Sequence, residues 1–492
     1  MALPIAVYSA SQVREFEARA IAAGVPGYTL MKRAGEGALR VLRSRWPRVA
    51  SIVVVCGGGN NGGDGYVLAR FARAAGLLVR VLAASDPATL TGDARHAYED
   101  ALASGCTIDA FSPDGLIDAE VIVDALLGIG TRLPLRPESR AIIEAIAASG
   151  RPVLALDLPS GIDPDTGVAD VAVRADVTLT FIALKTGLYC GQGPEYAGQI
   201  VCDELEAAPP DDVSPQLRRL DDACILRALP RRRRNAHKAE FGRILIIGGG
   251  TGMPGAVRLA AEAALRVGAG LVTVASLPEH LVAVVGPCPE LMFAALPDAD
   301  PLDDLLASAD VVVLGPGLGR TSWSQRIYAA VLARRRADQA LLLDADALNL
   351  LAADPSAPRH DDWILTPHPG EAARLLGVSP AQVQADRRAA LARLVETRGG
   401  RIVLKGAGTL IGARGMSPQI CERGNPGMAI PGMGDVLSGT IAGMLGQCHD
   451  AELAVAAAVF AHASAGDALA RNGERGILAT DVIRELRHWI NR

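Results

Sequence analysis

Short apolar runs alternate with longer stretches of helical periodicity along most of the chain. Runs at 51–56, 78–83, 120–124, 152–156 and 177–182 are separated by segments, many rich in alanine, in which apolar residues recur at helical spacing. Apolar runs of this length are typical of strands that are buried on both faces of a parallel sheet. The regular strand–helix alternation therefore predicts an α/β protein built from βαβ units.

The alternation stops once and then resumes, which predicts two domains. Residues 207–219 are rich in proline and charge, as a linker is, and 492 residues exceed what one core usually serves. Strand-like runs return at 243–248, 271–276, 310–314, 340–344, 363–366 and 401–405. We expect α/β domains over residues 1–212 and 220–492. Residues 11–45 predict two amphipathic helices before the first strand.

Composition limits the possible functions. The net charge of −5 argues against a nucleic-acid-binding surface, and no uninterrupted apolar run approaches the ~18 residues that cross a membrane. The first residues lack the pattern of a signal peptide. The eight cysteines show no Cys-x-x-Cys pair, which is typical of reduced thiols. We expect a cytoplasmic protein that acts on small molecules, and a homo-oligomer. The helices at 11–45 could cap the first domain or form a subunit interface.

A glycine-rich segment follows the first predicted strand. Residues 57–65 read Gly-Gly-Gly-Asn-Asn-Gly-Gly-Asp-Gly, and a helical pattern follows from Tyr66. Glycines let a backbone approach a ligand closely, and a helix N-terminus favours phosphate. We therefore predict a ligand-binding loop rather than only a tight turn. The spacing also matches the dinucleotide fingerprint, but residues 250–255 match it equally well, so the match alone is weak.

Two aspartates end later strands of the first half. Asp124 ends one apolar run and Asp157 ends the next, and each leads into a glycine-containing loop. Ligands of open α/β sheets collect at the carboxyl ends of strands, so these residues and the glycine-rich segment should line one crevice. The oxygen atoms of Asn61, Asp124 and Ser160 would suit a hard cation better than zinc.

Three motifs of the first half, in this order, resemble the NAD(P)H-hydrate epimerases over about residues 8–205: Gly57–Gly65, Asp124–Gly130 and Asp157–Ile162. The resemblance implies a Rossmann-like three-layer fold and interconversion of the R and S hydrates of NADH and NADPH (NADHX and NADPHX). It implies potassium at Asn61, Asp124 and Ser160, and catalysis by Asp157 against the nicotinamide ring. It implies hydrate binding by Asn60, Asn61, Gly62, Gly63, Asp64, Gly128, Ile129, Gly130, Thr131, Arg132, Leu133, Pro134 and Asp157.

Lysine is scarce, which draws attention to the few positions that keep it. Of the 49 basic residues only four are lysine. Lys185 follows a predicted strand, and Thr131-Arg132 stand where some epimerases carry a lysine. Lys185 could supply an amine to the first site, or it could be a structural or surface residue. Lys405 ends a strand in the second half, where a compact positive charge would suit a phosphate.

The second half carries three further motifs. Lys405 opens a glycine turn, Gly432-Met-Gly434-Asp435 leads into a helical run, and Thr366-Pro-His368-Pro-Gly-Glu371 follows a strand. Free amides at a helix N-terminus can hold a phosphoryl oxygen while Asp435 accepts a hydroxyl proton. His368 beside such a site is a candidate ligand contact. No Gly-x-x-x-x-Gly-Lys-Ser/Thr occurs, which excludes a P-loop.

These motifs resemble the ribokinase-like fold, and with Asp344-Ala-Asp-Ala-Leu-Asn, Gly315-Pro-Gly-Leu-Gly and His237-Lys238 they resemble the NAD(P)H-hydrate dehydratases over about 222–490. The resemblance implies dehydration of the S hydrate at the expense of ADP, with Mg²⁺ and with Asp435 as the base. It implies hydrate contacts at Ala256, Gly317, His368 and Asp435. It implies nucleotide contacts at Lys405, Gly406, Ala407, Gly408, Thr409 and Gly434.

The sequence thus predicts a bifunctional enzyme of nicotinamide-nucleotide repair, an isomerase joined to a lyase. Two alternatives stay open at this point. If the glycine fingerprint marks an ordinary dinucleotide-binding site, the chain would be a nicotinamide-dependent dehydrogenase fused to a small-molecule kinase. A non-catalytic nucleotide sensor would need the same loops without the chemistry of Asp435.

Overall fold

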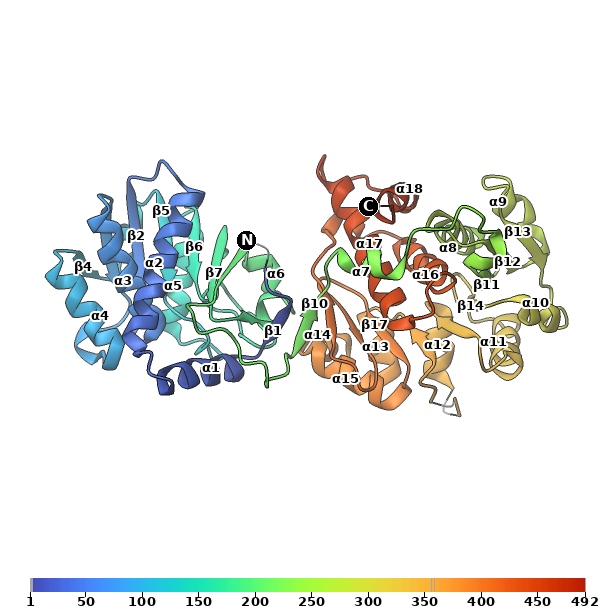
Figure 1. Cartoon of the computed structure of the whole chain (residues 1–492), viewed down its shortest axis with the longest axis horizontal. Coiled ribbons are helices and arrows are strands. Elements are labelled where there is room, and N and C mark those ends of the chain that lie inside the picture. Colours follow the sequence, from blue (N-terminus) through green and yellow to red (C-terminus); the bar gives the residue numbers. More distant parts are fainter. Residues whose placement is uncertain (1–2, 355, 358, 492) are drawn as a thin grey trace. The chain divides into compact units, whose positions relative to one another are not determined.

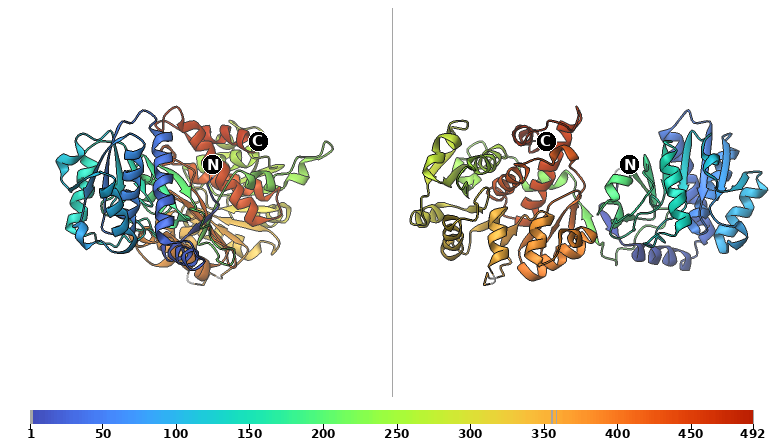
Figure 2. Two further views of the ribbon diagram at one scale, coloured as in Figure 1. Left: turned by 60° about the vertical axis from the view of Figure 1, so that its left-hand side comes forward. Right: turned by 180° about the vertical axis from the view of Figure 1, so that it is seen from behind.

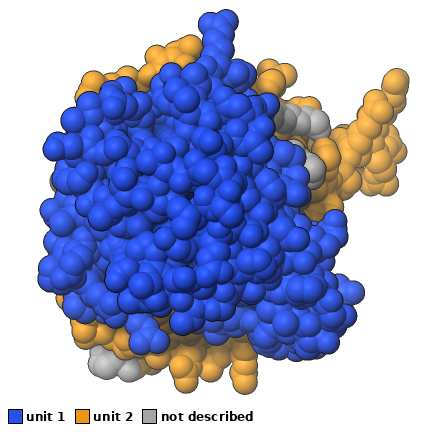
Figure 3. Space-filling model, turned by 90° about the vertical axis from the view of Figure 1, so that its left-hand side faces the viewer, with its two compact units in different colours: residues 1–218 blue, residues 219–492 orange. Residues whose placement is uncertain are grey.

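The computed structural model describes residues 3–354, 356–357 and 359–491. It divides the chain into two compact units, residues 1–218 and 219–492 (Figures 1 and 3). Each unit is a mixed α/β structure around a largely parallel sheet, so the predicted fold class is confirmed. The division falls at the end of the predicted linker.

In the described part of the chain, the first unit has a seven-stranded sheet in the order β4-β3-β2-β5-β6-β7-β9, with every pair parallel. The strands are β2 (Ser51–Cys56), β3 (Leu78–Ala83), β4 (Thr107–Ala110), β5 (Val121–Ala125), β6 (Val153–Leu156), β7 (Val177–Phe181) and β9 (Gln199–Asp203). The helices are α1 (Ala10–Ala22), α2 (Gly27–Arg45), α3 (Asn60–Ala74), α4 (Gly92–Ala103), α5 (Pro137–Ala148) and α6 (Gly193–Tyr196). The short strand β1 (Ala6–Tyr8) pairs antiparallel with β10 (Leu217–Arg219) and parallel with β8 (Leu184–Lys185), and the sequence pattern did not predict these three strands.

The sheet of the first unit is buried on both faces. Alternate residues of β2 join different cores: Ile52 and Val54 pack with residues of α1 to α4, whereas Val53 and Val55 pack with residues of α5. Helices therefore cover both faces of the sheet, which gives three layers (Figure 2). Burial on both faces explains why these strands read as continuous apolar runs.

The strand order reverses between β2 and β5, and this is where ligands of open α/β sheets bind. Cys56 pairs with Ala125 at the last position of both strands, so the loops that follow them start side by side. A Cβ atom at Gly57 would lie 2.0 Å from the Leu126 carbonyl oxygen. Only glycine allows the two loops to approach this closely.

Helix α3 begins at Asn60, six residues before the helical start that the sequence pattern predicted. Residues 60–65 are thus the first turns of a helix rather than a loop. The glycines on which the prediction of a loop rested serve close packing of the helix. A Cβ atom at Gly62 would lie 2.0 Å from the Gly57 carbonyl oxygen, and one at Gly63 would lie 2.5 Å from Met31 Cε.

The second unit has a sheet whose order is β13-β12-β11-β14-β15-β16-β17-β18-β19; the last three strands run antiparallel and the others parallel. The strands are β11 (Arg243–Ile247), β12 (Leu271–Ser276), β13 (Met292–Ala295), β14 (Val311–Leu314), β15 (Ala340–Leu343), β16 (Trp363–Leu365), β17 (Arg401–Leu404), β18 (Thr409–Gly412) and β19 (Gln419–Cys421). The helices are α7 (Ala223–Ala228), α8 (Pro254–Arg266), α9 (Leu281–Val285), α10 (Leu302–Ser308), α11 (Ser322–Arg334), α12 (Asp346–Ala353), α13 (Pro369–Leu376), α14 (Pro380–Ala385), α15 (Arg387–Arg398), α16 (Met433–Leu445), α17 (Ala451–Ala470) and α18 (Ala479–Trp489).

Helix α17 is long and apolar enough to cross a membrane by length and composition, the one such helix among the described residues. Within its most apolar window, 72% of the residues are buried inside the protein. Residues 454–461 of this helix belong to the main core of the second unit. Its apolarity is therefore explained by packing against α16, α18 and the sheet.

Candidate active sites

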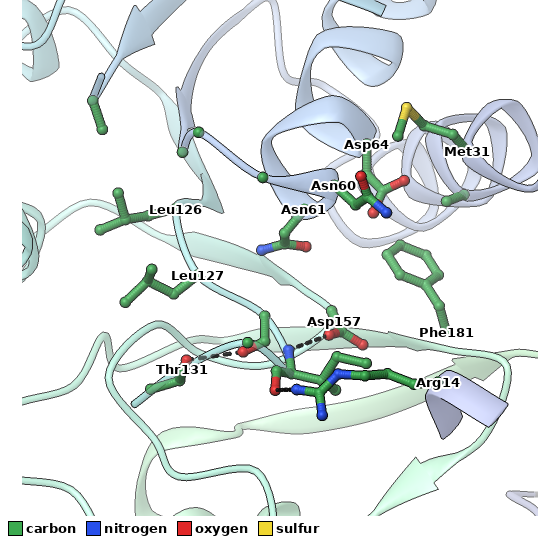
Figure 4. Close-up of a pocket in the computed structure, with 18 of the residues that line it drawn as sticks. Arg14, Met31, Asn60, Asn61, Asp64, Leu126, Leu127, Thr131, Asp157 and Phe181 are labelled. Carbon is green, nitrogen blue, oxygen red and sulfur yellow. Dashed lines mark hydrogen bonds between the residues drawn. The ribbon is translucent and has the colours of Figure 1, made fainter. Parts of the chain in front are cut away.

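A cavity of about 1050 Å³ opens at the strand-order reversal of the first unit (Figure 4). Its walls come from the glycine-rich segment, from the loop after β5, from Asp157 at the end of β6, and from helix α1. A cavity of this size suits a cofactor-sized ligand.

Some of the predicted residues of the first unit line the cavity and the others do not. Those that line the cavity are Asn60, Asn61, Asp64, Gly128, Ile129, Gly130, Thr131, Arg132 and Asp157. Gly62 and Gly63 lie behind the wall, where they allow close packing, and Leu133 and Pro134 continue the loop beyond it. Asp124 and Ser160 are fully buried beneath it.

The Asp157 carboxylate is fixed from both sides. One oxygen, Oδ1, accepts a hydrogen bond from Lys185 Nζ at 2.6 Å. The other, Oδ2, accepts from the Ile129 amide at 2.9 Å (Figure 4). Asp157 also has a backbone φ of 67°, a conformation that non-glycine residues rarely adopt. Such strain persists where the surroundings hold the residue, and it is common at functional sites.

Lys185 is fully buried, and its ammonium group is saturated. Besides Asp157, Nζ donates to Thr180 Oγ1 at 2.9 Å and to the Phe181 carbonyl oxygen at 2.6 Å. An ammonium has three protons to donate, and three acceptors are in place. Of the two roles that the sequence left open for Lys185, this geometry favours a fixed counter-ion for Asp157.

Other carboxyl groups share the cavity with Asp157. Burial, followed by the charges of Asp157 and Glu17, raises the pKa of Asp64 well above its usual value. Burial and the charge of Asp157 also raise the pKa of Glu17. The pocket therefore holds one carboxylate with a lysine counter-ion beside two carboxyl groups that are inclined to keep their protons.

Asp124 and Ser160 are hydrogen-bonded to each other beneath the cavity, and Asn61 lies in the cavity wall. Asp124 Oδ1 accepts from Ser160 Oγ at 2.6 Å and its Oδ2 accepts from the Ser160 amide at 2.8 Å. Burial raises the pKa of Asp124 to about 6 despite these bonds. The side-chain oxygen and nitrogen of Asn61 are buried without a hydrogen-bond partner.

In the second unit, Lys405 lies at the centre of a buried cluster of charged groups. Its Nζ is 2.8 Å from Asp344 Oδ1 and 4.0 Å from Glu371 Oε2. Burial alone would lower the pKa of Lys405, but the charges of Asp344 and Glu371 raise it above the usual value. Burial raises the pKa of Glu371 to about 7. His368 adjoins this group through its Nε2, 3.4 Å from Glu371 Oε1.

Asp435 stands in the first turn of α16, after two glycines at the helix start. A Cβ atom at Gly434 would lie 3.2 Å from Lys405 Nζ, so the helix N-terminus meets the lysine directly. Burial, followed by the charge of Asp344, raises the pKa of Asp435 to about 7. A carboxyl group with a pKa near neutrality suits general acid–base catalysis.

The remaining predicted residues lie around this cluster. Residues 406–408 form the turn between β17 and β18, and Arg387 Nη2 donates to the Gly408 carbonyl oxygen at 3.2 Å. At the strand-order reversal between β11 and β14, a Cβ atom at Gly317 would lie 2.9 Å from Ala256 Cβ. A Cβ atom at Gly432 would lie 2.7 Å from Leu259 of α8, the helix that carries Ala256.

Sequence reasoning did not single out several residues that line the first cavity. Arg14 and Glu17 come from α1, Asp93 from α4 and Glu138 from α5. Each is one polar residue on an amphipathic helix, and nothing in the local pattern separates it from a solvent-facing side chain. In the second unit, Asp344 was noted only as part of a motif, without a role.

The folds and sites together define a two-part α/β enzyme with a ribokinase-like second half. A family profile described as NAD(P)H-hydrate dehydratase matches residues 244–488, and one described as YjeF-related protein N-terminus matches residues 27–187. The chain is 48% identical to a bifunctional NAD(P)H-hydrate repair enzyme of Coxiella burnetii, over 99% of both chains. It is 43% identical to one of Escherichia coli, over 100% of this chain and 95% of that one. The chain belongs to the family of bifunctional NAD(P)H-hydrate repair enzymes.

Two solved structures resemble the second half. A ribokinase-like superfamily protein from Enterococcus faecalis is 31% identical with a TM-score of 0.53, over 57% of this chain and 98% of its own. An ADP/ATP-dependent NAD(P)H-hydrate dehydratase from Bacillus subtilis, co-crystallised with ATP and Mg²⁺, is 29% identical with a TM-score of 0.50, over 55% of this chain and 97% of its own.

Proposed function

We propose that residues 1–212 interconvert the R and S forms of NADHX and NADPHX, and that residues 220–492 convert the S form to NADH or NADPH at the expense of ADP, with AMP and phosphate as products. The observation that carries this proposal is the presence of one positioned carboxyl group in each unit. Asp157 faces the first cavity with a lysine counter-ion, and Asp435 opens helix α16 beside Lys405.

In the first unit we assign Asp157 as the base that acts on the hydroxyl group of the hydrated ring. Hydrogen bonds from the Lys185 ammonium and the Ile129 amide fix the position of the carboxylate. Helix α3 presents Asn60, and the loop after β5 presents residues 128–134, to the rest of the substrate. Lys185 touches Asp157 rather than the cavity centre, so we assign it as a positioning residue.

We infer that Asn61, Asp124 and Ser160 hold a potassium ion. Asp124 is fully buried, and among the described residues its hydrogen-bond donors are the Leu126 amide and the amide and hydroxyl of Ser160, none of them a cation. The polar side-chain atoms of Asn61 are buried with no partner among the described residues. A buried charge and an orphaned polar group are both costly, and a monovalent cation would satisfy them together. Asn61, Asp124 and Ser160 would hold the ion, and the ion would supply positive charge beneath the substrate phosphates.

In the second unit we assign Asp435 as the base for phosphoryl transfer. Asp435 takes the proton of the ring hydroxyl, whose oxygen attacks the terminal phosphorus of ADP, and AMP leaves. The C6–O bond then breaks with phosphate as leaving group, helped by the lone pair of the ring nitrogen, and loss of a C5 proton gives the reduced nicotinamide. Lys405, residues 406–409 and the amides of α16 would hold the phosphates. Ala256, Gly317 and His368 would contact the hydrate.

Magnesium fits this site only together with the nucleotide. Among the described residues there is no group of three His, Cys, Asp or Glu side chains that could hold a metal ion. Mg²⁺ is commonly held by few protein oxygens together with substrate phosphates and water. We therefore propose that Mg²⁺ enters with ADP and neutralises its phosphates. The Bacillus subtilis relative, described as ADP/ATP-dependent and co-crystallised with ATP and Mg²⁺, supports nucleotide use.

Incubation with racemic NADHX, resolved by chromatography, tests both assignments. With ADP and Mg²⁺, both epimers should be consumed and NADH and AMP should appear in equal amounts. The Asp435→Ala variant should lose all NADH formation and still equilibrate the epimers, whereas Asp157→Ala should lose equilibration and still consume the S form. Full NADH formation by the first variant would refute the role of Asp435.

The family to which the chain belongs is described as repairing and dehydrating NAD(P)H hydrates, not as transferring hydride. The dehydrogenase–kinase alternative therefore has no support. We further propose that the enzyme works in the cytoplasm as a homo-oligomer. All eight cysteines, which lie in the described part of the chain, are free thiols, as expected in a reducing compartment. Light scattering of the purified chain would give the oligomeric state.

A further inference from the structure

Asp344 is a buried carboxylate that the proposed chemistry does not use. It follows β15 directly and is 1% exposed. Its Oδ1 accepts from Lys405 Nζ at 2.8 Å and from Thr366 Oγ1 at 2.7 Å, and its Oδ2 accepts from Ser438 Oγ at 2.8 Å. Asp344 thus joins the ends of β15, β16 and β17 to helix α16. A carboxylate in the core persists only with such complete pairing.

The backbone around Asp344 has a strained conformation and a close loop contact. Ala345, the next residue, has a φ of 49°, which is strained for a residue with a side chain. A Cβ atom at Gly315 would lie 1.8 Å from the Asp344 carbonyl oxygen, so the loop after β14 must carry glycine there. The sequence motifs at 315–319 and 344–349 therefore meet at this one residue.

Asp344 also lies close to the catalytic end of α16. A Cβ atom at Gly434 would lie 3.9 Å from Asp344 Oδ2, and Gly434 directly precedes Asp435. Ser438, which Asp344 holds, is one helical turn beyond Asp435. The same carboxylate therefore contacts the helix that carries the base and the lysine that faces the phosphates.

We propose that Asp344 is a positioning residue of the dehydratase, which fixes Lys405 and helix α16 relative to each other and places a negative charge beside Asp435. The inference rests on the proposed role of Asp435 as base. It assigns a function to a carboxylate that would not itself contact the hydrate or the nucleotide.

The charge of Asp344 has a kinetic consequence. The groups whose charges act on Asp435 are Asp344 and Asp346 near β15, Glu371 on α13, and Lys405 after β17. The three carboxylates raise the pKa of Asp435 and Lys405 lowers it. Loss of the Asp344 charge should therefore lower the pKa of Asp435. Because the base must be ionised, the acidic limb of the pH–rate profile should move to lower pH.

The test is the pH dependence of dehydratase kcat in the full chain with S-NADHX, ADP and Mg²⁺, for the Asp344→Asn and Ser438→Ala variants. Asp344→Asn removes the charge and keeps the shape; Ser438→Ala removes one hydrogen bond and keeps the charge. Asp344→Asn should lower plateau kcat about 10- to 100-fold, which is the usual cost of a lost charge-assisted hydrogen bond, and shift the acidic limb to lower pH. Ser438→Ala should lower kcat with the limb unmoved and KM for S-NADHX little changed.

An Asp344→Asn variant with an unmoved limb, or with kcat within twofold of the parent, would overturn the proposal. Stabilisation of the variant by ADP in thermal unfolding shows whether the second unit is folded. If Asp344→Asn does not fold, the Ser438→Ala and Thr366→Val variants test the positioning role of Asp344. Parental kcat in both variants would overturn that role. Failure of the proposed function is distinguishable: Asp435→Ala would then retain dehydratase activity, whatever the Asp344 variants do.

Discussion

Replacement of Lys185 by methionine tests the electrostatic design of the first site most directly. Methionine approximates the length of the lysine stem without the ammonium, so Asp157 loses its counter-ion inside the protein. The Thr180 hydroxyl and the Phe181 carbonyl oxygen lose a partner as well. Removal of one partner of a buried ion pair costs about 3–5 kcal/mol.

The expected fall in the unfolding midpoint of the first unit is large enough to measure separately from unfolding of the second unit. In a unit of this size, each kcal/mol lowers the unfolding midpoint by about 2–4 °C, so the midpoint should fall by roughly 10 °C. The two activities of one sample give separate readouts after incubation at rising temperature. The midpoint for loss of epimerase activity should fall, and the midpoint for dehydratase activity should stay.

A double-mutant cycle separates the ion pair from general loss of packing. The Asp157→Asn change leaves the lysine without its counter-ion, and the double variant removes both charges. Because both variants lack the proposed base, the cycle is measured as unfolding of the first unit by calorimetry rather than as loss of epimerase activity. Because Lys185 and Asp157 are in contact, the double variant should be destabilised by less than the sum of the single variants. An epimerase midpoint for Lys185→Met within about 2 °C of the parent, or fully additive effects, would refute this reasoning.

Three further predictions follow from the structure. Dehydratase kcat should rise with pH through about 7, because burial raises the pKa of Asp435 to about 7 and only the ionised form accepts a proton; a flat profile from pH 6 to 8 would contradict the assignment. Replacing K⁺ by tetramethylammonium should lower epimerase activity and thermal stability, and Asn61→Leu should remove both responses, since its amide has no other partner among the described residues; a K⁺ response retained by Asn61→Leu would place the ion elsewhere. Gly57→Ala should destabilise the first unit by about 1–3 kcal/mol in chemical denaturation, because its Cβ atom would lie 2.0 Å from the Leu126 carbonyl oxygen; parental stability would show that the two loops can separate freely.

Much of the fold could be read from the sequence because both sheets are buried on both faces. Strands such as 51–56, 78–83 and 271–276 have the same bounds in the structure as in the apolar pattern. Short or half-exposed strands were missed: β4 is only partly buried, and β18 and β19 follow a glycine turn that pointed to a nucleotide site. The start of α3 was misplaced because glycine disfavours helices in general, whereas here Gly62 and Gly63 serve close packing.

The sequence by itself determined the two α/β units and the motifs that gather at strand ends, because periodicity and loop chemistry are local properties of the chain. It also determined that Asp157 would stand at a strand end and Asp435 at the start of a helix. Only the tertiary structure decided which distant groups surround them. Lys185 reaches Asp157 from β8, and Asp344 reaches Lys405 and Ser438 from β15. Charge and pKa depend on burial and on neighbours within a few ångströms, and strand order brings those neighbours together.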